Sequence, residues 1–144
     1  MDSKANENSS VRLWWVLASV GWAPLGVVAL HLVLAEFGLT ERFDAMLHFW
    51  GGAAVAYFVF GLVVRSQGLA PKIQGPFSYL FAFTCACTAA VFWEFAEFAL
   101  DRFEGTAIQG GLVETMLDLL RGVSGALVAV LGMASLKALL GQRA

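Results

Sequence analysis

The sequence from residue 43 to residue 64 reads FDAMLHFWGGAAVAYFVFGLVV. Its only acidic or basic side chains are Asp44 and His48, and both lie near its start. A helix of about 20 apolar residues is long enough to cross the hydrocarbon core of a bilayer, which is roughly 30 Å thick. Because lipid cannot hydrogen-bond to an open backbone, a stretch of this length and composition predicts a transmembrane α-helix.

Three further apolar stretches of similar length occur near residues 13–36, 77–99 and 113–139, and segments containing glycine or proline separate all four. The sequence therefore predicts an all-α fold, a four-helix transmembrane bundle, in a single membrane domain that covers residues 1–144. Only 14% of the residues are charged, against roughly 25% in soluble domains. Too few charges are left to coat a water-soluble surface.

The N-terminal region combines a polar tail with the first span. Residues 1–10 are polar and predict a disordered tail. The apolar run over residues 13–36 is longer than the roughly 7–15 residues of a signal-peptide core, so we expect a retained span. Pro24 inside this run predicts a kink, because proline removes a backbone hydrogen bond.

The basic residues indicate how the chain is oriented. Lysine and arginine concentrate on the cytoplasmic side of membrane helices. Six of the nine lie at the predicted end that holds both termini and the second loop: Lys4, Arg12, Arg65, Lys72, Lys137 and Arg143. We therefore predict a multi-pass protein of the inner (plasma) membrane with both termini cytoplasmic. With a net charge of −2 and no basic run, we expect the lipid bilayer and no nucleic acid as partner. Nothing in the sequence indicates an oligomeric state.

The acidic residues gather at one predicted depth. Nine of the eleven fall near the outer ends of the predicted helices: Glu36, Glu41, Asp44, Glu94, Glu97, Asp101, Glu104, Glu114 and Asp118. Asp44 and His48 are four residues apart and share a helix face, and Glu94 and Glu97 are three apart. Since their helices are antiparallel neighbours, we expect these faces and that of Asp118 to meet at one level.

Small residues continue the polar faces toward the membrane centre: Gly51, Gly52, Ala56, Gly122 and Gly125. They let membrane helices approach closely, so we expect the polar faces to point into the bundle. The large aromatic residues of the third span are expected to cover its other faces: Phe92, Trp93, Phe95 and Phe98.

Buried carboxylates need a compensating partner. A central acidic residue costs roughly 2.5–3.5 kcal/mol on insertion scales, and the carboxylates here outnumber Arg121 and His48. Histidine with carboxylates on facing helices is typical of metal sites in helical bundles. We therefore predict a divalent metal ion held by His48, Glu94 and Asp118, with Glu97, Asp44 or Glu114 completing the site. For metal-assisted hydrolysis, the expected catalytic bases are Glu94 and Glu97.

Other interpretations stay open. A haem between His31 and His48 would suit two histidines at similar depth, but the surrounding carboxylates favour a hard cation over haem. The pocket could instead take a polar lipid headgroup or another cell-envelope ligand. A further interpretation is that the acidic side chains only stabilise helix ends and that the chain is a non-catalytic scaffold or interaction subunit of a membrane complex. The sequence alone does not decide between an enzyme and a scaffold.

The same residues resemble a known group of proteins. The motifs that carry the resemblance are Asp44-x-x-x-His48-x-x-Gly51-Gly52, Trp93-Glu94-x-x-Glu97 and Asp118-x-x-x-Gly122-x-x-Gly125. The first and last resemble elements of VanZ-like proteins, and all three resemble elements of YjdF-like inner-membrane proteins. Ala45 stands where these families usually have lysine. The resemblance implies a small inner-membrane protein of the cell envelope, and the VanZ branch is linked with teicoplanin resistance.

Overall fold

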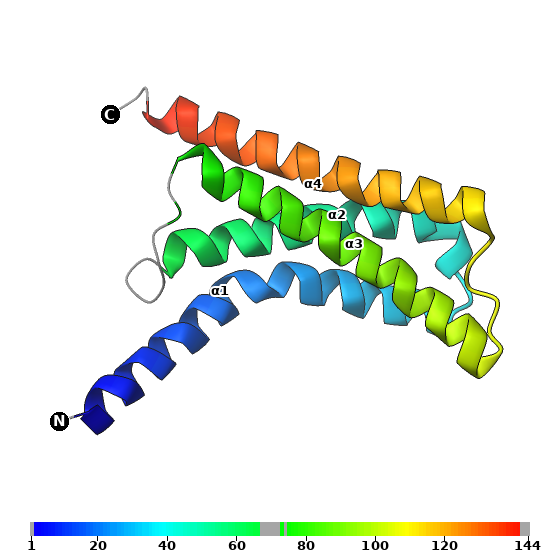
Figure 1. Ribbon diagram of the computed structural model, residues 1–144, viewed down its shortest axis with the longest axis horizontal. Helices are drawn as coiled ribbons and strands as arrows, with labels where there is room; N and C mark the ends of the chain where they lie inside the picture. The colour runs from blue at the N-terminus through cyan, green and yellow to red at the C-terminus, as the bar shows by residue number, and fades with distance from the viewer. Residues whose placement is uncertain (1, 67–72, 74, 142–144) are drawn as a thin grey trace.

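The computed structural model describes residues 2–66, 73 and 75–141. Nearly all of them lie in four helices: α1 (Asp2–Glu36), α2 (Thr40–Arg65), α3 (Pro76–Glu104) and α4 (Leu112–Gly141), shown in Figure 1. The described residues form no β-strand. The prediction of an all-α, four-helix fold is confirmed.

Each helix contains a segment long and apolar enough to cross a membrane: Trp14–Glu36, Thr40–Arg65, Pro76–Glu104 and Leu112–Gly141. The shortest has 23 residues, and at 1.5 Å per residue it is about 35 Å long. The predicted spans match these segments within a few residues. The largest difference is at the end of α3, which continues to Glu104 and ends only at Gly105, where φ is 69°. This left-handed conformation stops a helix and favours glycine.

The start of α1 differs from the prediction of a disordered tail over residues 1–10. α1 begins at Asp2, well before its apolar segment begins at Trp14. Residues 2–10 contain no glycine or proline. Once the apolar part has formed a helix, each further residue adds a backbone hydrogen bond at low cost, so the helix continues. Pro24 lies inside α1, and Figure 1 shows this helix bent, as a kinked span would be.

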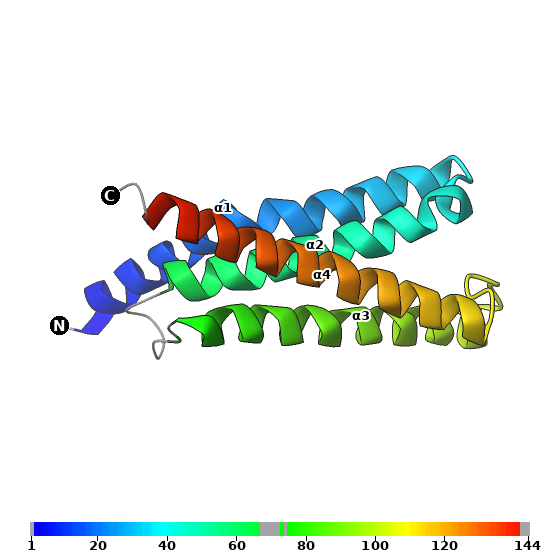
Figure 2. The same cartoon turned by 90° about the horizontal axis from the view of Figure 1, so that it is seen from above.

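α2 lies at the centre of the bundle. It packs against α1, α3 and α4, and α3 also packs against α4. Among the described residues, the backbone of α1 approaches that of α2 alone. The start of α1 and the end of α4 lie at one end of the bundle, and the α1–α2 and α3–α4 connections lie at the other (Figures 1 and 2). We call the second end the loop end.

Glycine and alanine allow the central helices to approach closely. A Cβ atom added at Gly52 would overlap the backbone carbonyl of Gly122, and one added at Gly125 would overlap that of Phe49. Deeper in the bundle the core consists of Ala56, Ala86, Ala126 and Val130. The predicted small-residue faces are therefore confirmed as the contact between α2 and α4.

Large apolar side chains cover the outside of all four helices. Examples are Trp22 at 63% exposure, Trp50 at 56%, Phe92 at 65% and Leu120 at 60%. In water such a continuous apolar surface would drive association. In a bilayer it faces lipid, which is the environment that the composition predicts.

Candidate functional site

Polar side chains from three helices meet near the loop end of the bundle. Asp44 and His48 lie near the start of α2, Glu94 and Glu97 lie in the last third of α3, and Asp118 lies near the start of α4. We call these five residues the carboxylate–histidine cluster. Five of the six candidate ligands lie close together here, but the predicted inner set of His48, Glu94 and Asp118 is divided between two groups that share His48.

His48 is the shared member of the cluster. Its Nε2 atom lies 3.3 Å from Asp44 Oδ1, and its Nδ1 atom lies 3.7 Å from Glu94 Oε1. Potential ligand atoms form two overlapping groups, in each of which they lie within 4.8 Å of one another. The first is Asp44, His48 and Asp118, and the second is His48, Glu94 and Glu97. Ligands at 2.0–2.6 Å from one ion lie at most about 4–5 Å apart, so either group could surround an ion.

The inner part of the cluster is buried. Exposure is 4% for Glu94, 9% for Glu97 and 4% for Asp118, and the His48 side chain is 8% exposed. Within the described residues, neither carboxylate oxygen of Glu94 has a hydrogen-bond partner. Burying a carboxylate in this state costs free energy, because its oxygens lose their hydrogen bonds to water and no protein hydrogen bond replaces them.

The remaining carboxylates have partners. Arg121 donates a hydrogen bond to Asp118, and its Nη1 atom lies 3.8 Å from Asp44 Oδ2. Glu97 Oε1 accepts a hydrogen bond of 2.8 Å from the indole N–H of Trp93. Four carboxyl groups therefore meet one guanidinium and one imidazole, so these two basic groups can balance at most two ionised carboxylates.

Glu114 lies outside the carboxylate–histidine cluster. Its side chain is exposed and its carboxylate lies beside Gly110. It belongs to neither group of potential ligands. Of the three residues expected to complete the site, Glu97 and Asp44 lie in these groups and Glu114 does not, because α4 begins at Leu112 and Glu114 lies in its exposed first turn, one turn before Asp118.

Trp93 has a role that the sequence analysis misses. We expected it to cover a lipid-facing side of α3, but its indole N–H binds Glu97 and its ring packs edge-to-face on His31. The ring centroids are 5.4 Å apart. The signal was present, since Trp93 and Glu97 are four residues apart on a helix. His31 lies outside both ligand groups and connects α1 with α3 through this aromatic contact.

The loop between α3 and α4 is tied to the site by hydrogen bonds. The Asp101 carboxylate accepts bonds from Thr106 Oγ1 at 2.6 Å, from the Ile108 N–H at 2.7 Å and from the Gln109 N–H at 2.9 Å. The Gln109 side chain donates to the Glu94 backbone carbonyl at 3.3 Å. Asp101 therefore shapes the loop and contributes nothing to the ligand groups.

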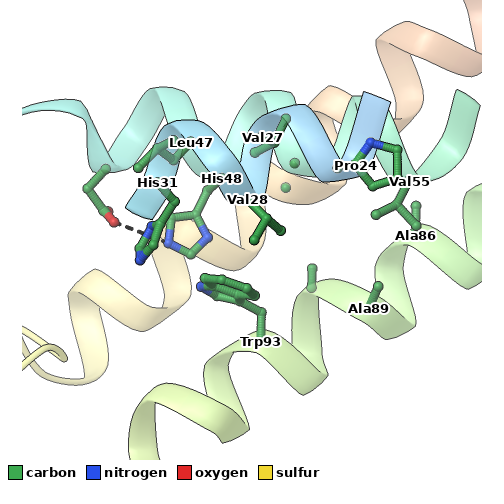
Figure 3. Close-up of a pocket in the computed structure, with 15 residues that line it drawn as sticks. Pro24, Val27, Val28, His31, Leu47, His48, Val55, Ala86, Ala89 and Trp93 are labelled. Atoms are coloured by element: carbon green, nitrogen blue, oxygen red, sulfur yellow. Dashed lines mark ion pairs between the residues drawn. The ribbon is translucent and has the colours of Figure 1, made fainter. Parts of the chain in front are cut away.

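A cavity of about 140 Å³ extends from the cluster toward the membrane centre. Its polar end contains His31, Asp44, His48 and Trp93, and its other end is lined by apolar and small residues such as Pro24, Val55 and Ala86. Figure 3 shows this division, with His31, His48 and Trp93 together and Pro24, Val55 and Ala86 apart from them.

The fold and this site define an α-helical polytopic membrane protein with a buried carboxylate–histidine cluster. The chain belongs to the family described as "Predicted membrane protein (DUF2238)", which matches residues 9–138. This confirms a small membrane-protein family. The chain is also similar to a Thermotoga maritima protein described as "Uncharacterized protein", with 33% identity over 98 residues. That match covers 65% of this chain and 50% of the relative, so the chain matches half of the relative's length. No solved structure matches the chain.

Proposed function

We propose that the carboxylate–histidine cluster binds a divalent cation near one surface of the membrane. The observation that carries the proposal is the Glu94 carboxylate, which is 4% exposed and has no hydrogen-bond partner for either oxygen within the described residues. His48 Nδ1 is 3.7 Å from it. A bound cation would supply the partner that this buried carboxylate lacks.

The charge of the cluster favours a cation over internal pairing. Arg121 contacts Asp118 and Asp44, so its positive charge is directed to the α2–α4 side. On the α3 side, Glu94 and Glu97 lie together with His48. A divalent ion on that side would balance the two carboxylates of α3.

His48 is oriented as metal-binding histidines are. Such a residue usually gives one ring nitrogen to the metal and holds the other against a carboxylate. Here Asp44 lies at Nε2, and Nδ1 faces Glu94. His48 Nδ1 with the carboxylates of Glu94 and Glu97 would hold the ion, and Asp118, which belongs to the other ligand group, would stay with Arg121. One imidazole with several carboxylates suits Mn²⁺, Fe²⁺ or Zn²⁺.

A cation in this position would also activate water for hydrolysis. Glu94 and Glu97 are the carboxylates placed to act as general base. The resemblance to VanZ-like and YjdF-like proteins runs through the same residues and supports a role in the cell envelope, with a polar lipid headgroup as the second ligand class. The distribution of lysine and arginine supports an inner-membrane location with both termini cytoplasmic.

Metal analysis of the detergent-purified protein tests the proposal. After incubation with Mn²⁺ or Zn²⁺ and removal of free ion, we expect about one ion per chain in the wild type. Glu94→Gln and His48→Ala each remove a direct ligand, so affinity should fall by more than the roughly 10- to 100-fold that loss of an outer-shell partner costs. Glu104→Gln is the matched control, because Glu104 is exposed and outside the cluster.

Equal metal content in wild type and Glu94→Gln, with both eluting as folded protein, would contradict the site. So would a wild type that retains neither ion.

A non-catalytic scaffold is the second candidate, and one observation favours it. An apolar groove of about 650 Å³ lies between α1, α2 and α4, with Trp22, Trp50, Ala129 and Gly132 in its lining. A helix of a partner subunit could occupy it, since small residues favour helix contacts in membranes. The scaffold interpretation gains if Glu94→Gln keeps full activity in cells while Trp50→Ala loses it.

A further inference from the structure

The cavity beside the carboxylate–histidine cluster is amphipathic. Its polar end is formed by His48 of the cluster together with His31 and Trp93. Beyond them the walls are formed by apolar and small residues: Pro24, Val27, Val55, Gly51, Ala86 and Ala89. A ligand that fills the whole space must therefore have one polar end and one hydrocarbon end.

The cavity reaches the lipid-facing surface between α1 and α3. Within the described residues the backbones of these two helices do not approach each other, and the ring contact between His31 and Trp93 joins them at the polar end of the cavity. Val28 of α1 and Trp93 of α3 both line the cavity, yet they are 41% and 39% exposed. A molecule dissolved in the bilayer can therefore reach the cavity from the side, without passing through water.

His31 adds a polar group from the α1 side. It lines the cavity but belongs to neither ligand group, and its ring contacts Trp93 at the boundary between polar and apolar walls. An oxygen-rich head between the proposed ion and His31 would have a cation on one side and an imidazole on the other. A phosphate monoester has this chemistry, because its oxygens bind divalent ions and accept hydrogen bonds.

We infer that the cavity binds a single-chain lipid phosphate, with the phosphate beside Asp44 and His48 of the carboxylate–histidine cluster and the chain leaving between α1 and α3 into the bilayer, because a cavity of about 140 Å³ holds only the first part of the chain. This inference rests on the proposed cation, since the cluster alone is negative and would repel phosphate. Free phosphate would leave the apolar part of the cavity beyond His48 empty, so we expect a lipid phosphate to bind more tightly than free phosphate.

Binding to the Mn²⁺-loaded protein in a neutral detergent tests the inference. The probe is lysophosphatidic acid, a single-chain phosphate monoester, and native mass spectrometry counts the bound molecules. We expect one molecule per metal-loaded chain, at least tenfold tighter than inorganic phosphate, and loss of this binding after the metal is removed with EDTA.

A cavity-filling variant separates the lipid from the ion. A Cβ atom at Gly51 would meet only Val27 Cγ1, at 4.0 Å, so Gly51→Leu fills the cavity without forcing backbones apart. We expect at least a tenfold loss of lipid binding with metal content unchanged. Gly26→Leu is the matched control, since a Cβ there meets nothing within 4 Å and Gly26 lies outside this cavity. Ala89→Leu is the second filling variant if Gly51→Leu does not fold.

The outcomes are distinguishable because metal content is measured on the same samples. Metal without lipid binding overturns this inference and leaves the proposed function intact, whereas absence of metal overturns both. Lipid binding that both filling variants retain would show that the chain lies elsewhere. Tighter binding of dodecylamine to the metal-free protein than of lysophosphatidic acid to the loaded protein would show a cationic ligand, and would also overturn the inference.

Discussion

Burial of the Glu94 carboxylate lowers the stability of the metal-free protein, although the proposed cation site requires this residue. Its carboxylate is buried and has no hydrogen-bond partner in the described part of the chain. Burying a polar group in this way costs about 1–3 kcal/mol, and more when the group is charged. A cation that binds the folded protein at Glu94, as proposed, would raise the stability of the bundle, because it binds the folded state and not the unfolded one.

Replacing Glu94 by glutamine should therefore stabilise the metal-free protein. The amide removes the buried charge and can donate to Glu97 or to His48. We expect the unfolding midpoint of Glu94→Gln in EDTA to rise by about 3–9 °C above the wild type. Thermal unfolding in detergent, followed by circular dichroism, measures this.

The same variant should lose the response to metal. Mn²⁺ should raise the unfolding midpoint of the wild type and of the control Glu104→Gln, and leave that of Glu94→Gln unchanged. A Glu94→Gln protein less stable than the wild type in EDTA would show that this carboxylate holds the bundle together without an ion.

At the residue scale, the sequence predicts the members of the cluster but not their surroundings. Asp44 with His48 and Glu94 with Glu97 are close along a helix, so spacing alone places each pair on a face. The contact of Gln109 with the Glu94 carbonyl joins residues fifteen apart through a loop. No helix periodicity relates such positions, so the path of the loop had to be known first.

At the scale of helices, the contact between α2 and α4 depends on glycine. Gly52 and Gly125 meet the backbone of the opposing helix so closely that no Cβ fits. The same approach brings His48 and Asp118 into one group of potential ligands. Helix spacing and site geometry are therefore set by the same contact.

Gly125→Ala should push α2 and α4 apart. Overpacking of this kind costs about 1–3 kcal/mol, so we expect the unfolding midpoint to fall by about 3–9 °C. Metal affinity should fall too, because Asp118 moves away from His48. Gly132→Ala is the control in the same helix, since a Cβ there meets nothing within 4 Å. A Gly125→Ala protein with wild-type stability and metal affinity would argue against this contact.

The number and length of the helices could be predicted, but not all of their contacts. Apolar length and glycine or proline breaks determine the spans. Lipid is as apolar as the helix surfaces, so hydrophobic periodicity says little about which faces meet. Small residues indicate the α2–α4 contact correctly. Gly26 of α1 indicates no such contact, since a Cβ atom there would meet no neighbour within 4 Å.

At the scale of the whole molecule, the polar site lies at the loop end. The start of α1 and the end of α4 point toward the opposite end of the bundle (Figure 1). The carboxylate–histidine cluster lies toward the α3–α4 loop, since Gln109 of that loop donates to the Glu94 carbonyl. The orientation of the chain in the membrane therefore decides which compartment the cluster faces.

The distribution of lysine and arginine predicts that the loop end faces outward. Of the seven basic residues in the described part of the chain, Lys4, Arg12, Arg65 and Lys137 lie toward the opposite end, and positive charge is retained on the cytoplasmic side. In a protein with Cys85 and Cys87 replaced by serine, Ala107→Cys lies in the exposed α3–α4 loop and Gly141→Cys at the exposed end of α4. A membrane-impermeant maleimide on intact cells should label Ala107→Cys fully and Gly141→Cys only after permeabilisation. The reverse pattern would place the cluster at the cytoplasmic surface, where its ligands would come from the inner leaflet and the cytosolic metal pool.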